Sequence, residues 1–208
     1  MIINKDEILI VILAGGLSSR FGGGFKTLRK FNNKSILDRI IGKLINTEIE
    51  ITINANSNEE EFLKKKISII PDIDKQYQGP LAGIYASMKW SSKNYSNKKW
   101  IFTIPSDTPF LPDNLIDIFL TNFSSTKKIF IARSYKKPHP VIGMWNIGLI
   151  KNLHNFLIGN NRKIMDWVIQ NEFKFVDFDF KDYDCFFNIN TEADLTEASK
   201  IEKEIVNK

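Results

Sequence analysis

Hydrophobic residues along the chain fall into short runs that polar and glycine-rich stretches separate. The first run, 8–13, is continuous and rich in β-branched side chains, which is typical of a strand buried on both faces. Later runs are four to six residues long, and proline stops two of them. We expect strands at 8–13, 49–54, 67–70, 100–104, 129–132, 141–145 and 173–178.

Between these runs the apolar positions recur at helical spacing. In the segment 35–44 the isoleucines and leucines share one side, and Ser35 is suited to cap the helix. Pro80 and Pro112 stand where a first helical residue often stands, and 191–194 resembles a capping box. We expect helices at about 35–44, 59–66, 80–90, 112–120, 147–157 and 162–170, and a last helix opening at 191–194.

The alternation of strands and helices predicts an α/β fold of three layers, in which a mostly parallel sheet has helices on both faces. Such sheets bind ligands outside the carboxyl ends of their strands. Gly15, Asn54, Asp72 and Asp107 each lie at or just past an expected strand end. We therefore expect four segments to direct polar groups to one edge. No repeat and no long linker divides the 208 residues, so a single domain is expected.

Composition and charge limit the cellular location and the classes of partner that we expect. The single cysteine, Cys185, excludes an internal disulfide and fits a reducing, cytoplasmic location. The net charge of +5 mildly favours anionic partners such as phosphates, but the basic residues are scattered, so no nucleic-acid partner is expected. The run 8–14 is too short for a membrane span or a signal peptide, so no membrane partner is expected.

The segment 13–26 reads Leu-Ala-Gly-Gly-Leu-Ser-Ser-Arg-Phe-Gly-Gly-Gly-Phe-Lys. Backbone N–H groups of a glycine-rich loop after a strand can surround phosphates, and Lys26 would add positive charge. The loop is not a Walker loop, because Phe25 precedes Lys26, and the dinucleotide-binding glycine pattern is absent. Taken alone, the segment could also be a flexible surface loop.

Seven motifs follow one another along the chain: the loop with Lys26; Asn54-Ala-Asn56; Asp72 with 79–83 (Gly-Pro-Leu-Ala-Gly); 105–112 (Pro-Ser-Asp-Thr-Pro-Phe-Leu-Pro); 139–145; Arg162-Lys163; and 188–195. Together, over about residues 8–195, they resemble the molybdenum cofactor guanylyltransferase, or MobA, family. This chain departs from the family pattern at Phe25, where the family usually has Asp, and in the three glycines that space the loop. The resemblance implies a Rossmann-like nucleotidyltransferase fold.

The resemblance implies a GTP site with a Mg²⁺ ion. Mg²⁺ binds one or two carboxylates together with substrate phosphates and water, and Asp107, at a strand end, suits that role. Arg20 is expected to contact the triphosphate or, alternatively, to be a solvated loop residue. The implied GTP-site residues are Leu13, Ala14 and Gly15 along the guanosine, Lys26 at the phosphates, Asn54 and Asp72 at the nucleoside, and Asp107 at Mg²⁺; Lys26, Asp107 and Arg20 are the expected catalytic residues.

Two nucleoside residues have simpler alternatives. A carboxylate at Asp72 could accept hydrogen bonds from the N1–H and N2–H₂ edge of guanine, but Asp72 could also be a turn residue after Pro71. Asn54 could be an ordinary strand-end residue. On the acceptor side, the molybdopterin candidates are His139, Trp145, Asn188 and Asn190, with Trp145 equally suited to the core.

The resemblance implies transfer of GMP from GTP to molybdenum-bound molybdopterin, which yields the guanine dinucleotide cofactor and pyrophosphate. It places GTP and Mg²⁺ in about residues 1–112 and molybdopterin in about 113–200, and suggests molybdoenzymes or their chaperones as protein partners. One alternative is a related enzyme that uses CTP on molybdopterin or on a sugar-alcohol phosphate. Another is a non-catalytic carrier that binds GTP or molybdopterin.

Overall fold

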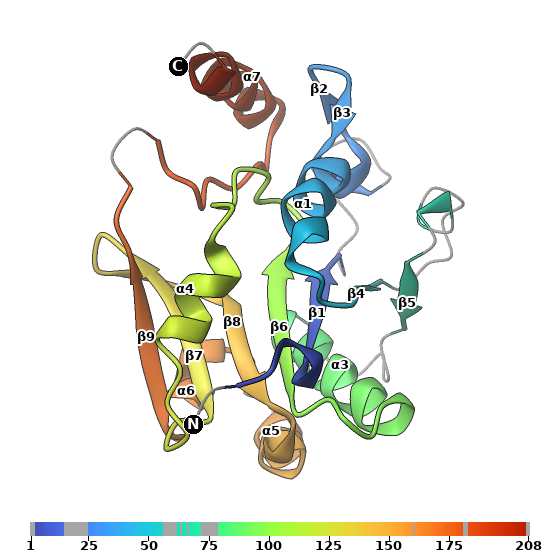
Figure 1. The fold of residues 1–208 in the computed structure, drawn as a ribbon, viewed down its shortest axis with the longest axis vertical. Helices are drawn as coiled ribbons and strands as arrows, with labels where there is room; N and C mark the ends of the chain where they lie inside the picture. Colours follow the sequence, from blue (N-terminus) through green and yellow to red (C-terminus); the bar gives the residue numbers. More distant parts are fainter. Residues whose placement is uncertain are drawn as a thin grey trace.

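The computed structural model describes residues 3–14, 25–55, 62, 64–65, 67–71, 79–159, 161–180 and 183–206. Seven strands of the described residues form one sheet in the order β5-β4-β1-β6-β8-β7-β9 (Figure 1). Only β8 runs against the others, since it pairs antiparallel with both of its neighbours. The strands are β1 (Ile8–Leu13), β4 (Ile51–Asn54), β5 (Ser68–Ile70), β6 (Trp100–Pro105), β7 (Ile129–Ser134), β8 (Lys137–Asn146) and β9 (Phe173–Phe178).

Helices cover both faces of this sheet. Alternate residues of β1 show why, because Ile8, Ile10 and Ile12 pack into one apolar cluster and Leu9 and Val11 into the other. The first cluster receives α1 (Ile36–Leu44), α4 (Leu115–Thr121) and α7 (Glu192–Val206). The second receives α3 (Pro80–Asn94), α5 (Ile150–Ile158) and α6 (Ile164–Val168). The predicted three-layer, mostly parallel α/β fold is confirmed.

The expected element boundaries differ from the structure mainly at the ends. The strand expected at 49–54 begins at Ile51, the helix expected from Pro112 begins at Leu115, and the helix expected at 162–170 spans Ile164–Val168. The helix expected at 147–157 opens with a 3₁₀ turn, Ile147–Leu149. Of the helix expected at 59–66, only residues 62, 64 and 65 are described, and the first two are helical.

Two features of the fold lie beyond the carboxyl ends of the central strands. A small hairpin of β2 (Lys30–Phe31) and β3 (Lys34–Ser35) precedes α1, and α7 packs against β2. Figure 1 shows both at the top, on the side to which β1 and β6 point. Helix α7 begins at the expected capping box, since the Asp194 N–H donates to Thr191 Oγ1 at 3.2 Å and the Thr191 N–H donates to Asp194 Oδ2 at 2.8 Å.

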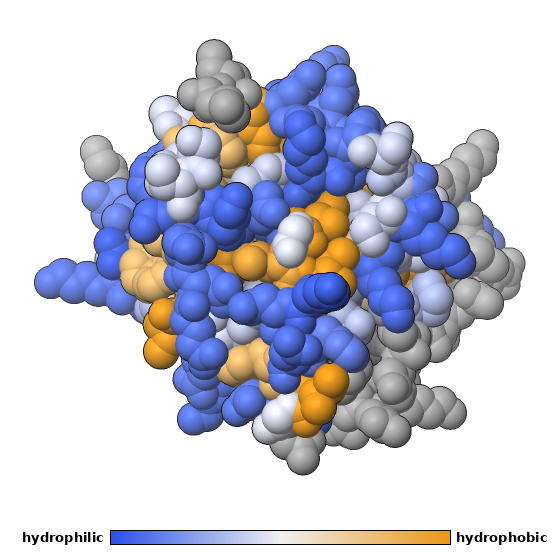
Figure 2. All heavy atoms as spheres, turned by 90° about the horizontal axis from the view of Figure 1, so that it is seen from below, coloured by the Kyte–Doolittle hydropathy of each residue, from blue (hydrophilic) through white to orange (hydrophobic). Residues whose placement is uncertain are grey.

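The opposite side carries the amino ends of β1 and β6. Figure 2 shows this side as mostly hydrophilic, with apolar residues in separate small areas. The large apolar side chains that the described residues expose most, Ile45, Tyr135, Ile158 and Ile169, come from four different segments. Within the described ranges, none of the helices combines the length and the apolar character that a membrane span requires.

Candidate active site

The end of β1 forms the centre of the candidate site. Its last residue, Leu13, is paired with Asn54 of β4 on one side and with Pro105 of β6 on the other. Two backbone bonds continue this alignment past the strands, from the Ala14 N–H to the Asn54 oxygen at 2.9 Å and from the Ser106 N–H to the Leu13 oxygen at 3.2 Å. The sheet therefore brings the segments after β1, β4 and β6 to one edge, as such parallel sheets do.

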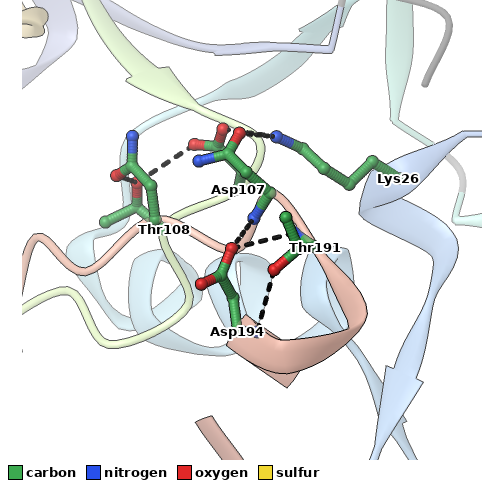
Figure 3. Close-up of polar contacts among 7 residues, drawn as sticks. Lys26, Asp107, Thr108, Thr191 and Asp194 are labelled. Carbon is green, nitrogen blue, oxygen red and sulfur yellow. Dashed lines mark hydrogen bonds and ion pairs between the residues drawn. The ribbon is translucent and has the colours of Figure 1, made fainter. Parts of the chain in front are cut away.

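Lys26 and Asp107 meet at this edge. The Lys26 ammonium donates to Asp107 Oδ2 at 2.7 Å and to Asn190 Oδ1 at 2.8 Å (Figure 3). These three residues lie 81 to 164 positions apart along the chain, so only the fold brings them together. The side chains of Lys26 and Asp107 are 19% and 17% exposed, which leaves a partly screened ion pair within reach of a ligand.

The backbone before Lys26 is held by an aromatic contact. Lys26 opens a 3₁₀ turn, Lys26–Leu28, and Phe25 precedes it. The Phe25 ring packs edge-on against the buried Phe62 ring, with 5.2 Å between the ring centroids. An aromatic contact therefore stands at the position where the resemblance leads one to expect Asp.

Asp107 lies in the turn that follows β6, and the chain near residue 190 covers this turn. The Ile189 N–H donates to the Asp107 backbone oxygen at 2.9 Å. The hydroxyl of the fully buried Thr108 donates to Asn188 Oδ1 at 2.9 Å and lies 3.3 Å from Asp107 Oδ1. The segment 188–190 thus contacts the turn through its backbone and through Asn188, while the side-chain oxygen of Asn190 accepts from Lys26.

Asn54 is also at the edge, but its side chain is buried at 1% exposure. Its Nδ2 donates to the Ile70 backbone oxygen at 3.1 Å. Its Oδ1 lies close to Gly83 of α3, where an added Cβ would be 2.5 Å away. Asn54 therefore joins β4, β5 and α3 behind the site.

His139 lies at the same side of the sheet, because β8 runs antiparallel to β6 and His139 stands four residues before Gly143, the partner of Thr103. Its Nε2 lies 2.7 Å from Ser134 Oγ, and its ring packs on Phe186 at 4.7 Å between centroids. Burial lowers the pKa of His139, against the attraction of Asp184. At neutral pH the ring is therefore neutral.

The position of Trp145 corrects one expectation. Trp145 is fully buried, its Nε1–H donates to Thr103 Oγ1 at 2.8 Å, and its ring stacks on Trp167 at 5.6 Å. It pairs with Ile101, near the amino end of β6. Because its polar atom is used and its ring is enclosed, Trp145 belongs to the core and not to an acceptor site. Gly15, Arg20 and Asp72 lie outside the described residues.

Comparison with known proteins decides the family. The family model described as the MobA-like NTP transferase domain matches residues 10–172. The chain belongs to the MobA-like NTP transferase family. A molybdenum cofactor guanylyltransferase of Nitrobacter hamburgensis is 34% identical to this MobA-like chain over 193 residues, which cover 92% of each protein.

Solved structures agree on the fold. A molybdopterin-guanine dinucleotide biosynthesis protein A from Archaeoglobus fulgidus is similar with a TM-score of 0.71 at 19% identity, over 94% of this chain and 99% of that one. A 4-diphosphocytidyl-2C-methyl-D-erythritol synthase from Anaerococcus prevotii is similar with a TM-score of 0.72 at 12% identity, over 96% and 97%. This MobA-like chain is therefore an enzyme of a nucleotidyltransferase family.

The oxygen donors of the site fit Mg²⁺. In the described part of the chain no three His, Cys, Asp or Glu side chains gather into a complete metal site. Mg²⁺ does not need one when it binds a nucleotide, because phosphates and water supply most of its ligands. Asp107 offers a carboxylate, and the exposed Asn188 and Asn190 bring amide oxygens to the same turn.

The sequence alone did not reveal the contact of Thr108 with Asn188 or that of Asp194 with the Asn190 backbone. Thr108 was part of the expected motif, but its hydroxyl partner lies 80 residues away and no local pattern reveals it. Asp194 was expected only as a helix cap. In the structure its Oδ2 also accepts from the Asn190 N–H at 2.8 Å, which connects the cap to the site. The sequence signal for this contact is that Asn190 stands directly before the capping box 191–194, four residues before Asp194.

Proposed function

We propose that this MobA-like enzyme transfers GMP from GTP to molybdenum-bound molybdopterin and releases pyrophosphate. The observation that carries the proposal is the meeting of Lys26, Asp107 and Asn190 at the carboxyl edge of the sheet. This edge is where open α/β sheets bind nucleotides. The choice of GTP and of the acceptor is supported by the names of the relatives, which include the guanylyltransferase that is 34% identical.

The reaction needs positioning and charge neutralisation more than covalent help from the protein. An oxygen of the molybdopterin phosphate attacks the α-phosphorus of GTP, the bond from that phosphorus to the bridging α–β oxygen breaks, and pyrophosphate leaves with the electron pair. Lys26 and Asp107 neutralise each other in the described structure. When a triphosphate binds, the Lys26 ammonium is expected to turn from Asp107 to the phosphate oxygens.

Asp107 would then be free to hold Mg²⁺. A bound Mg²⁺ supplies positive charge that neutralises the phosphates and the charge that develops on the leaving oxygen. Arg20, outside the described residues, stays a predicted triphosphate contact. Lys26 is the described residue that contributes positive charge directly at Asp107.

The nucleoside side of the site is proposed to follow the end of β1. Leu13 and Ala14, together with Gly15, would lie along the guanosine. Asn54 would act there mainly through its packing, because its amide nitrogen already donates to Ile70. Selection of guanine by Asp72 stays a prediction.

The acceptor side is proposed to lie in the half of the chain after about residue 113. His139, Asn188 and Asn190 remain the candidate molybdopterin residues, and Trp145 no longer belongs with them. The two asparagines are exposed, and their segment covers the Asp107 turn. Molybdoenzymes or their chaperones as partners, and a cytoplasmic location, stay predictions.

The fold alone is equally compatible with the cytidylyltransferase alternative, because the 4-diphosphocytidyl-2C-methyl-D-erythritol synthase of Anaerococcus prevotii is as similar in structure as the protein from Archaeoglobus fulgidus. The carrier alternative depends on Phe25, which packs on Phe62 where the family usually has Asp. A carrier would bind GTP and release no pyrophosphate.

Pyrophosphate release from each of the four NTPs, with Mg²⁺ and molybdenum-loaded molybdopterin, tests the proposal. We expect release with GTP and not with the other three NTPs. The rate of release should fall by about 10²–10³-fold in Lys26→Met and Asp107→Asn, which is the range for removal of one charge-stabilising group. Lys34→Met is the matched control, because Lys34 is exposed on the neighbouring hairpin. Release with CTP instead would favour the cytidylyltransferase, and equal losses in Lys34→Met and Lys26→Met would contradict the assigned roles.

A further inference from the structure

Asn190 has no strand or helix to hold it in place. It lies in the irregular segment between residues 188 and 191, just before α7. Its side-chain oxygen accepts from the Lys26 ammonium at 2.8 Å, and it is exposed. The direction of this side chain therefore depends on whatever fixes the backbone of Asn190.

Asp194 fixes that backbone. One carboxylate oxygen, Oδ2, accepts from the Asn190 N–H and from the Thr191 N–H, both at 2.8 Å (Figure 3). Hydrogen bonds to an ionised acceptor are the stronger kind. The pKa of the Asp194 carboxyl lies below its ordinary value because the Asn190 N–H donates to it, and the nearby positive charge of Lys26 acts in the same direction.

Helix α7 is itself attached to the hairpin that follows Lys26. Glu202, two turns further along α7, accepts from Asn32 Nδ2 at 2.7 Å and forms an ion pair with Arg39. Arg39 in turn donates to the Phe31 backbone oxygen at 2.7 Å and lies over the Phe31 ring at 3.8 Å. The helix that carries Asp194 is thus held at both ends relative to the segment that carries Lys26.

We propose that Asp194 is a positioning residue for the transfer reaction. By binding the Asn190 backbone, it holds the Asn190 amide against the Lys26 ammonium and so aligns that ammonium beside Asp107 for the triphosphate. Asp194 contacts none of the reacting groups. The inference rests on the proposed function for the identity of the nucleotide, but the contacts that carry it are independent of the acceptor.

Thr191 provides a matched control within the same cap. Its hydroxyl accepts from the Asp194 N–H at 3.2 Å, so Thr191→Val removes one capping bond and leaves the bond from the Asn190 N–H in place. Asp194→Ala removes the cap and that bond together. Both variants lower the stability of the start of α7, whereas only Asp194→Ala releases Asn190.

The experiment measures the Kd of GTP with Mg²⁺ by titration calorimetry, and the melting temperature, for wild type, Asp194→Ala, Thr191→Val, Asn190→Ala and the Asp194→Ala/Asn190→Ala double variant. We expect about a tenfold weaker Kd in Asp194→Ala, as for loss of a supporting residue around a site. Thr191→Val should have a lower melting temperature with an unchanged Kd. In the Asn190→Ala background, Asp194→Ala should weaken the Kd of GTP by less than about a further twofold, because the effects of residues that act through one another are not additive.

An Asp194→Ala effect that multiplies fully with that of Asn190→Ala, or one that Thr191→Val reproduces, would overturn the proposal. If Asp194→Ala does not fold, Asp194→Asn replaces it, since its neutral oxygen can still accept both N–H groups but more weakly. An unchanged Kd in that variant would also overturn the proposal. If the wild type binds GTP but transfers no GMP, the proposed function is refuted. The comparison of the GTP Kd values among the variants still tests the positioning role of Asp194.

Discussion

Replacement of Gly83 by alanine tests the packing behind the nucleotide edge. Gly83 lies in α3, and a Cβ there would be 2.5 Å from Asn54 Oδ1 and 3.1 Å from Leu13 Cδ2. The first separation is about 0.9 Å short of an ordinary contact of 3.4 Å. Asn54 is almost fully buried, so its side chain cannot turn into solvent. Either α3 moves outward or Asn54 gives up its hydrogen bond to Ile70.

The magnitude follows from opposing terms. Alanine gains about 1 kcal/mol over glycine inside a helix. Overpacking costs about 1–3 kcal/mol, and a lost hydrogen bond that leaves a buried amide unpaired costs about 1–3 kcal/mol more. We expect Gly83→Ala to lower the free energy of unfolding by about 1–5 kcal/mol, which is roughly 2–20 °C in melting temperature for a chain of this size.

Gly42→Ala is the matched control for this prediction. Gly42 lies in α1, and nothing is within 4 Å of its added Cβ, so the helix gain of about 0.5–1 kcal/mol should appear alone. Calorimetry of both variants, with and without GTP, compares them directly. Gly83→Ala should melt lower and bind GTP more weakly, while Gly42→Ala should melt higher and bind as the wild type does. A Gly83→Ala protein that melts as high as Gly42→Ala would refute the close approach of α3 to Asn54.

Two further predictions concern Trp145 and His139. Trp145→Phe loses the hydrogen bond to Thr103 and should reduce the free energy of unfolding by about 1–2 kcal/mol while the KM for the acceptor stays unchanged; a raised acceptor KM at equal stability would contradict its place in the core. The pKa of His139 is lowered in the folded state, so the unfolded chain takes up its proton first as the pH falls. The stability due to neutral His139 is therefore full above a pH of about 6.5 and is lost on acidification below it. His139→Gln should show a smaller fall in unfolding free energy between about pH 7.5 and 5.5, and an identical pH profile would contradict this reasoning.

The sequence predicts the buried strands well, because burial on both faces leaves a clear run of apolar residues. β1 begins and ends where the pattern 8–13 does, and β9 agrees with 173–178 in the same way. β8 was expected only at 141–145 but begins at Lys137. Pro138 and Pro140 hide its first part, because proline cannot donate to a sheet, and the register against β7 shifts between Ile131 and Ala132.

The meeting of Lys26 with Asp107 could be expected from strand ends, since the fold class alone places both segments at one edge. The direction in which the side chain of Trp145 points could not be expected from the sequence. Successive side chains of β8 point to opposite faces of the sheet, and both faces are covered. The burial of Trp145 depends on Trp167, which lies 22 positions later in the chain. Contacts such as that of Thr108 with Asn188 likewise require the relative placement of distant segments, which local patterns do not contain.

The most direct test of the central claim follows the nucleotide into the product. GTP labelled at the α-phosphate is incubated with the enzyme, Mg²⁺ and molybdenum-loaded molybdopterin, and label bound to the pterin is measured beside CTP labelled in the same way. We predict transfer of label from GTP, a mass increase that corresponds to GMP, and loss of transfer in Lys26→Met and Asp107→Asn. Label that moves from CTP and not from GTP, or that stays in GTP while GTP is bound, would contradict the account.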